Sequence, residues 1–106
     1  MSEAPEKIAT ENNMGNMDAG QAEEFFNSVK AELGLGELGF GITTAGSICM
    51  GDKILIDEKD LHYPWFTKQM VLHEIAHHLA PEDSTHGTRF HKKYAELVSR
   101  FLAGFH

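Results

Sequence analysis

Two histidines and a glutamate in the stretch MVLHEIAHHLA have the spacing of a metal-binding helix. His73 and His77 are four residues apart, so on a helix their imidazoles lie one above the other and can reach the same ion. Glu74, the next residue around the helix, can address a water molecule on that ion without binding the metal itself. Neutral imidazole nitrogens suit Zn²⁺. The pattern H-E-x-x-H therefore predicts a zinc site with Glu74 as general base.

The histidine pair lies outside the main apolar face of the predicted helix. At about 100° per residue, one face collects most of the large apolar side chains: Val71, Leu72, Ile75, Ala76 and Leu79. His73 and His77 lie roughly opposite, beside a partly apolar surface that includes Phe66. We interpret this surface as the floor of a cleft. His78 borders the main apolar face, so we expect it to pack or to form a hydrogen bond and not to bind the metal.

A catalytic zinc site needs three protein ligands and one open position. The residues downstream offer five candidates for the third ligand: Glu82, Asp83, His86, His91 and Glu96. Glu96 is expected to face solvent, and His91 lies at the edge of the apolar face of the final predicted helix. His86 is better placed because it stands at the start of that helix, where Gly87 allows a close backbone approach.

The elements that must position these residues follow from hydrophobic spacing and from glycine and proline signals. We expect a flexible polar tail over 1–20 and one domain over 21–106. The predicted elements are a helix over 21–36 that Gly34 and Gly36 end, two or three short strands within 38–57, a helix from Pro64 that Pro81 ends, and a helix over 88–103 with Ser84 or Thr85 as N-cap. This order predicts an α+β fold.

Composition excludes several classes of protein. The net charge of −7 and the lack of a basic cluster argue against binding to nucleic acid. The single cysteine, Cys49, excludes an intrachain disulfide and a cysteine zinc ribbon, and we interpret it as a small apolar strand residue. We see no signal peptide or membrane-spanning stretch, so a cytoplasmic protein is predicted.

The stretch VLHEIAHHL, followed by HGTRFHKKYAELV, resembles the SprT-like zincins and their small bacterial and phage relatives, a group of metallohydrolases. In that group H-E-x-x-H is followed by an H-G-x-x-F segment that opens the next helix. The resemblance implies His73, His77 and His86 as Zn²⁺ ligands and Glu74 as general base. It also implies a minimal zincin-like domain, in which a small mixed sheet packs on the active-site helix and a C-terminal helix follows. The cysteine-rich ribbon and basic DNA-binding parts of larger members are missing here.

The resemblance implies a zinc-dependent hydrolase. Among hydrolases, it favours a metallopeptidase acting on a peptide or protein. By the same resemblance, the stretch SICMGDKILID would supply a sheet edge that holds an extended peptide. Four residues could stabilise the oxyanion: His62, Tyr63, His91 and Tyr94. Two alternatives remain open: a structural zinc in an interaction module, and a metal-free histidine cluster that responds to pH.

Overall fold

The computed structural model describes residues 16–81 and 86–102 of the 106-residue chain. Within these ranges the elements are α2 (Ala19–Leu33), β1 (Gly39–Thr43), β2 (Ile48–Cys49), β3 (Lys53–Asp57), the short 3-10 helix η1 (Glu58–Asp60), α3 (Pro64–Leu79) and α4 (Thr88–Leu102). Three α-helices and a three-stranded mixed sheet confirm the predicted α+β fold class. The expected N-cap residues of the last helix, Ser84 and Thr85, lie outside the described residues.

Helix α2 begins two residues before the predicted helix because Asp18 caps it. The Asp18 carboxylate accepts a hydrogen bond from the Gln21 N–H at 2.8 Å, and the Gln21 side chain accepts one from the Asp18 N–H at 2.9 Å. Met17 is buried. Residues 17–20, which we expected in the tail, therefore belong to the folded domain, and residues 1–15 lie outside the described residues. Gly34, with φ of 65°, ends the helix as predicted.

The sheet has the order β1-β3-β2, in which β1 is parallel to β3 and β2 is antiparallel to it. The central strand supplies Ile54 and Ile56, both fully buried. Gly41 in β1 makes room for Leu55, because a Cβ at Gly41 would lie 2.9 Å from the Leu55 Cδ2 atom. A larger residue at this position would require the end of the Leu55 side chain to move.

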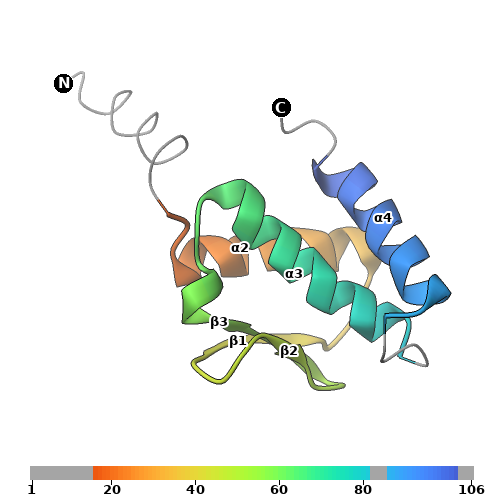
Figure 1. Cartoon of the computed structure of the whole chain (residues 1–106), viewed down its shortest axis with the longest axis horizontal. Coiled ribbons are helices and arrows are strands. Elements are labelled where there is room, and N and C mark those ends of the chain that lie inside the picture. The colour runs from red at the N-terminus through yellow and green to blue at the C-terminus, as the bar shows by residue number, and fades with distance from the viewer. Residues whose placement is uncertain (1–15, 82–85, 103–106) are drawn as a thin grey trace.

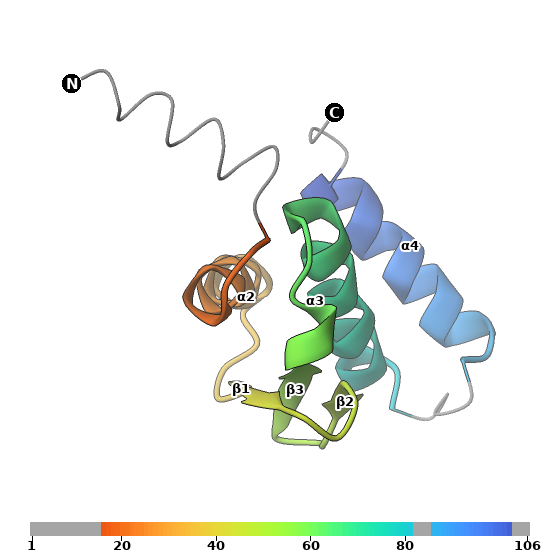
Figure 2. The same ribbon diagram turned by 60° about the vertical axis from the view of Figure 1, so that its left-hand side comes forward.

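All three helices lie on the same side of the sheet, with α3 between α2 and α4 (Figures 1 and 2). The core lies between the helices and the strands. Its α3 side chains are fully buried and belong to the predicted apolar face: Val71, Leu72, Ile75 and Ala76. Within residues 16–81 and 86–102, no helix is long and apolar enough to span a lipid bilayer.

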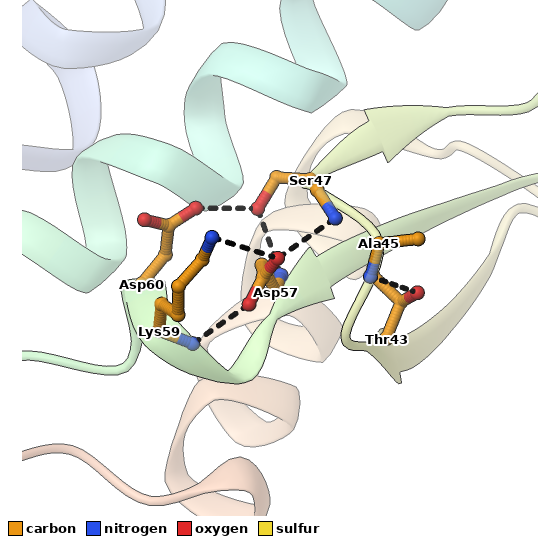
Figure 3. Close-up of polar contacts among 7 residues, drawn as sticks. Thr43, Ala45, Ser47, Asp57, Lys59 and Asp60 are labelled. Atoms are coloured by element: carbon orange, nitrogen blue, oxygen red, sulfur yellow. Dashed lines mark hydrogen bonds and ion pairs between the residues drawn. The ribbon is translucent and has the colours of Figure 1, made fainter.

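A network of polar contacts fixes the loop that leads into β2 (Figure 3). Asp57, buried at the end of β3, accepts hydrogen bonds from the N–H groups of Gly46 at 2.7 Å and Lys59 at 2.8 Å. The Ser47 hydroxyl accepts the Asp57 N–H and donates to the Asp60 carboxylate, both at 2.8 Å. The hydrogen bond from Lys59 lowers the pKa of Asp57, although burial works against it. The network ties the loop before β2 to the chain that leads toward α3.

Candidate metal centre

Three histidine side chains meet where the end of α3 approaches the start of α4. The Nε2 atom of His86 lies 2.9 Å from that of His77 and 3.3 Å from that of His73. One ring nitrogen from each residue falls within 4.8 Å of the other two. The structure thus brings together His73, His77 and His86, the three residues that the family resemblance implies as ligands. We refer to them as the histidine group.

Helix geometry and one unusual backbone angle bring the three rings together. His73 and His77 are one helical turn apart on α3, so their rings lie side by side with centroids 5.0 Å apart. His86 precedes α4 and has φ of 63°, in the left-handed region that non-glycine residues seldom adopt. We expected Gly87 to allow a close backbone approach at this point. The left-handed conformation instead falls on the histidine itself.

Phe90, one turn after His86 and buried in the core, contacts every ring of the histidine group. Its ring stacks on His77 with centroids 4.4 Å apart, and it meets His73 and His86 edge to face at 5.0 and 4.7 Å. Packing of this kind restricts the rotation of the imidazoles. The sequence alone did not assign Phe90 a role in the site. The useful signal was its position as the last residue of H-G-x-x-F, four residues after His86.

Glu74 is almost fully buried, and it lines the same cleft as the histidine group. Burial raises the pKa of its carboxyl group to about 7, and the nearby negative charge of Asp60 adds to this effect. A general base is most effective when its pKa is close to the pH at which it works. The position and basicity of Glu74 therefore suit proton transfer near neutral pH.

Their surroundings favour the neutral form of His73 and His77. Partial burial lowers the pKa of His73 to about 4, and the neighbouring His77, His86 and His91 contribute to the decrease. Burial and the neighbouring His86 also lower the pKa of His77. An imidazole must be neutral to donate its lone pair to a metal ion. The site therefore keeps these two rings ready to bind metal at neutral pH.

The histidine group forms one side of a cleft of about 580 Å³ between α3 and β2. The described residues that line it are Ser47, Ile48, Cys49, Gly51, His73, Glu74, His77, His78, Pro81 and His86. A smaller cavity of about 310 Å³ lies between α2 and the start of α3, and no histidine is among the described residues that line it. The larger cleft is therefore the one that combines space with reactive side chains.

The other candidates for the third ligand fall into two classes. Within the described residues, His91 and Glu96 are both exposed and neither belongs to the histidine group. Glu96 instead forms an ion pair with Lys93 at 3.4 Å on the outer face of α4. Glu82 and Asp83 lie outside the described residues. The geometry thus favours His86 among the candidates that the structure describes.

None of the four candidates for stabilising the oxyanion is among the described residues that line the cleft. His62 and Tyr63 gather with Phe66 at the start of α3. The Tyr94 ring lies 5.5 Å from the His73 ring, and its hydroxyl hydrogen bonds with the Gln69 side chain. His78, which we expected to have a packing or hydrogen-bonding role, does line the cleft.

No family model, curated protein or solved structure matches this chain. The likeness to SprT-like zincins therefore rests on the two sequence motifs alone. A functional conclusion for this protein must come from the chemistry and geometry of its own residues.

Proposed function

We propose that this protein is a zinc-dependent hydrolase of the H-E-x-x-H type, acting as a peptidase. The observation that carries the proposal is the convergence of three imidazole nitrogens beside a buried carboxylate in one open cleft. Within the described residues, the group contains no carboxylate or thiolate that would close a four-ligand structural site. Three protein ligands next to an accessible space are typical of catalytic zinc and not of structural zinc.

The spacing of the histidine nitrogens fits a zinc ion. Zn–N bonds of about 2.0–2.1 Å at tetrahedral angles separate two ligand nitrogens by about 3.3 Å. The Nε2 atom of His86 is 3.3 Å from that of His73 and 2.9 Å from that of His77. All three ligand nitrogens lie within 4.8 Å of one another, so side-chain movements alone would bring them to this spacing. His73, His77 and His86 would hold the ion.

The proposed chemistry divides between the metal and Glu74. A bound zinc ion would supply Lewis-acid polarisation of a peptide carbonyl and make water more acidic. The Glu74 carboxylate accepts a proton from the attacking water as the new C–O bond forms. It then delivers this proton to the amine nitrogen as the C–N bond breaks. Its raised pKa, about 7, allows both transfers near neutral pH.

The edge of the sheet supports a peptide as substrate. Met50 donates a backbone hydrogen bond to Lys53 at 2.8 Å, and the register pairs Cys49 with Ile54. Because antiparallel pairs alternate, the N–H and C=O of Cys49 then point away from β3 toward the free edge. An extended peptide could pair with these groups at the mouth of the cleft, next to the histidine group.

The experiment measures zinc content and peptide hydrolysis in three variants of the purified protein. Glu74→Gln should keep one zinc per chain and lose roughly a hundred- to ten-thousandfold in turnover, because only proton transfer is removed. His73→Ala should lose both zinc and turnover. His62→Ala, which removes an exposed histidine outside the cleft, is the matched control and should change neither.

Two results would contradict the proposal. If the wild-type protein binds no zinc and its melting temperature does not change when a chelator is added, the histidine group is not a metal site. If it binds zinc but Glu74→Gln changes stability and leaves hydrolysis unaffected, Glu74 is not the general base. A structural role for the metal would then be the better explanation.

A further inference from the structure

His78 has a position in the cleft that the proposed reaction has not used. It is four residues after Glu74 on α3, so these two side chains form a row beside the row of His73 and His77. His78 is half-buried and lines the cleft together with both rows. It nevertheless does not belong to the histidine group. Its ring therefore faces the space that a substrate would occupy without being positioned as a ligand.

Ser47 and the histidine group already have partners in the cleft, and Glu74 is the proposed base, whereas His78 has no partner among the described residues. The Ser47 hydroxyl is used by Asp57 and Asp60, and the three rings of the histidine group contact one another. No hydrogen bond or ion pair joins His78 to any residue within 16–81 or 86–102. A neutral imidazole carries one N–H donor and one acceptor nitrogen. The N–H of His78 is thus available to a molecule bound in the cleft.

We propose that His78 is a substrate-binding residue, which donates a hydrogen bond to a backbone carbonyl of the bound peptide. This inference rests on the proposed function and adds a contact to it. Four residues of helix rise about 6 Å, and an extended peptide advances about 3.3 Å per residue. The carbonyl that His78 contacts therefore lies within about two residues of the scissile bond. The contact aligns the peptide between the edge of β2 and Glu74.

The test separates binding to the metal from binding to the rest of the cleft. Calorimetry on zinc-loaded protein would compare acetohydroxamate, which reaches only the metal, with two tripeptide hydroxamates that extend to either side of the metal-binding group. His78→Leu should keep one zinc per chain and bind acetohydroxamate as the wild type does. It should bind at least one tripeptide hydroxamate roughly three- to tenfold more weakly, the effect of one lost neutral hydrogen bond.

Two further variants keep the result interpretable. His78→Gln retains an N–H donor and should recover part of the lost affinity, and His78→Met replaces His78→Leu if the latter does not fold. The inference is overturned if the variants without a donor bind both kinds of probe as the wild type does. It is also overturned if they weaken both probes equally, or if they lose zinc. If the zinc-loaded wild type binds no hydroxamate at all, the proposed function fails as well, because the metal then has no open position.

Discussion

The two faces of α3 differ in what they contribute to the molecule. On one face Val71, Leu72, Ile75 and Ala76 are fully buried against the sheet and the neighbouring helices. The other face presents three histidines and a buried glutamate to a cleft. Burial of apolar groups stabilises the fold, whereas partial burial of ionisable groups opposes it. The apolar face therefore accounts for folding, and burial does not explain the cleft face, for which we propose metal-dependent chemistry.

One substitution on each face should produce opposite phenotypes. Ile75→Ala leaves a cavity in the core and should reduce the free energy of unfolding by about 2–5 kcal/mol. The folded fraction should still bind zinc. His77→Ala should abolish zinc binding and leave the stability of the metal-free protein nearly unchanged. Urea unfolding and zinc titration of both variants measure the two effects, and loss of zinc binding in folded Ile75→Ala would contradict the division between the faces.

Phe90 connects the two faces, because it is a core residue that packs against the three proposed metal ligands. Phe90→Leu keeps an apolar side chain but removes the flat ring that contacts all three imidazoles. Residues that orient metal ligands typically change metal affinity by about 10- to 100-fold, and we expect a decrease in this range. Competition with a chelator of known affinity provides the measurement. Leu97→Val on the same helix is the control, and an equal decrease there would show that Phe90 has no particular role.

The cleft face should also give the metal-free protein two opposing pH dependences. The pKa of His73 is lowered from 6.5 to about 4 in the folded protein. As the pH drops from 6.5 to about 4, the unfolded chain binds a proton at this residue before the folded protein does, so the free energy of unfolding falls. The pKa of Glu74 is raised from 4.5 to about 7 in the folded protein. As the pH rises from 4.5 to about 7, the unfolded chain loses this proton before the folded protein does, so the free energy of unfolding falls. Glu74→Gln removes the second effect alone.

The melting temperature of metal-free Glu74→Gln should therefore rise between about pH 4 and 6.5, and it should exceed that of the wild type by several degrees above pH 7. Thermal unfolding in the presence of a chelator, at a series of pH values, is the measurement. His73→Gln should shift the profile in the opposite sense, toward greater stability in acid. A Glu74→Gln profile parallel to the wild type would show that the carboxyl group titrates normally.

The smallest effect is expected where the cleft meets the sheet. Ser47→Ala removes the hydroxyl that the Asp57 N–H and the Asp60 carboxylate share, and should cost about 1 kcal/mol of unfolding free energy. Zinc affinity should not change, because the hydrogen bonds of the Ser47 hydroxyl go to Asp57 and Asp60 and not to the histidine group. Denaturant unfolding and zinc titration of the variant measure both quantities. A large loss of zinc affinity would mean that this network also positions the metal ligands.

The sequence was sufficient for features that depend on local spacing. The apolar face of α3, the pairing of His73 with His77 and the glycine end of α2 all follow from helical periodicity or from one residue type. The stretch 38–57 could be assigned to strands, but not to a parallel pairing of β1 with β3, because strand order depends on contacts between distant residues.

The parts of the site that escaped prediction depend on how α3 and α4 pack. The aromatic support by Phe90 and the exposure of His78 to the cleft arise from the relative placement of elements that periodicity does not specify. The start of α2 was missed for a different reason. Its capping box uses Asp18 and Gln21, whose polar character and setting in an Asn-rich stretch made residues 17–20 resemble a tail.

The left-handed backbone of His86 places two requirements in conflict at one residue. Its φ of 63° costs a non-glycine residue about 1 kcal/mol, and a glycine at this position would adopt it freely. Gly87 is adjacent, so exchanging the order of the two residues would relieve the local strain. The same exchange would carry the imidazole away from the other two rings. Local backbone energy thus favours one order of His and Gly, and the geometry of the histidine group requires the other.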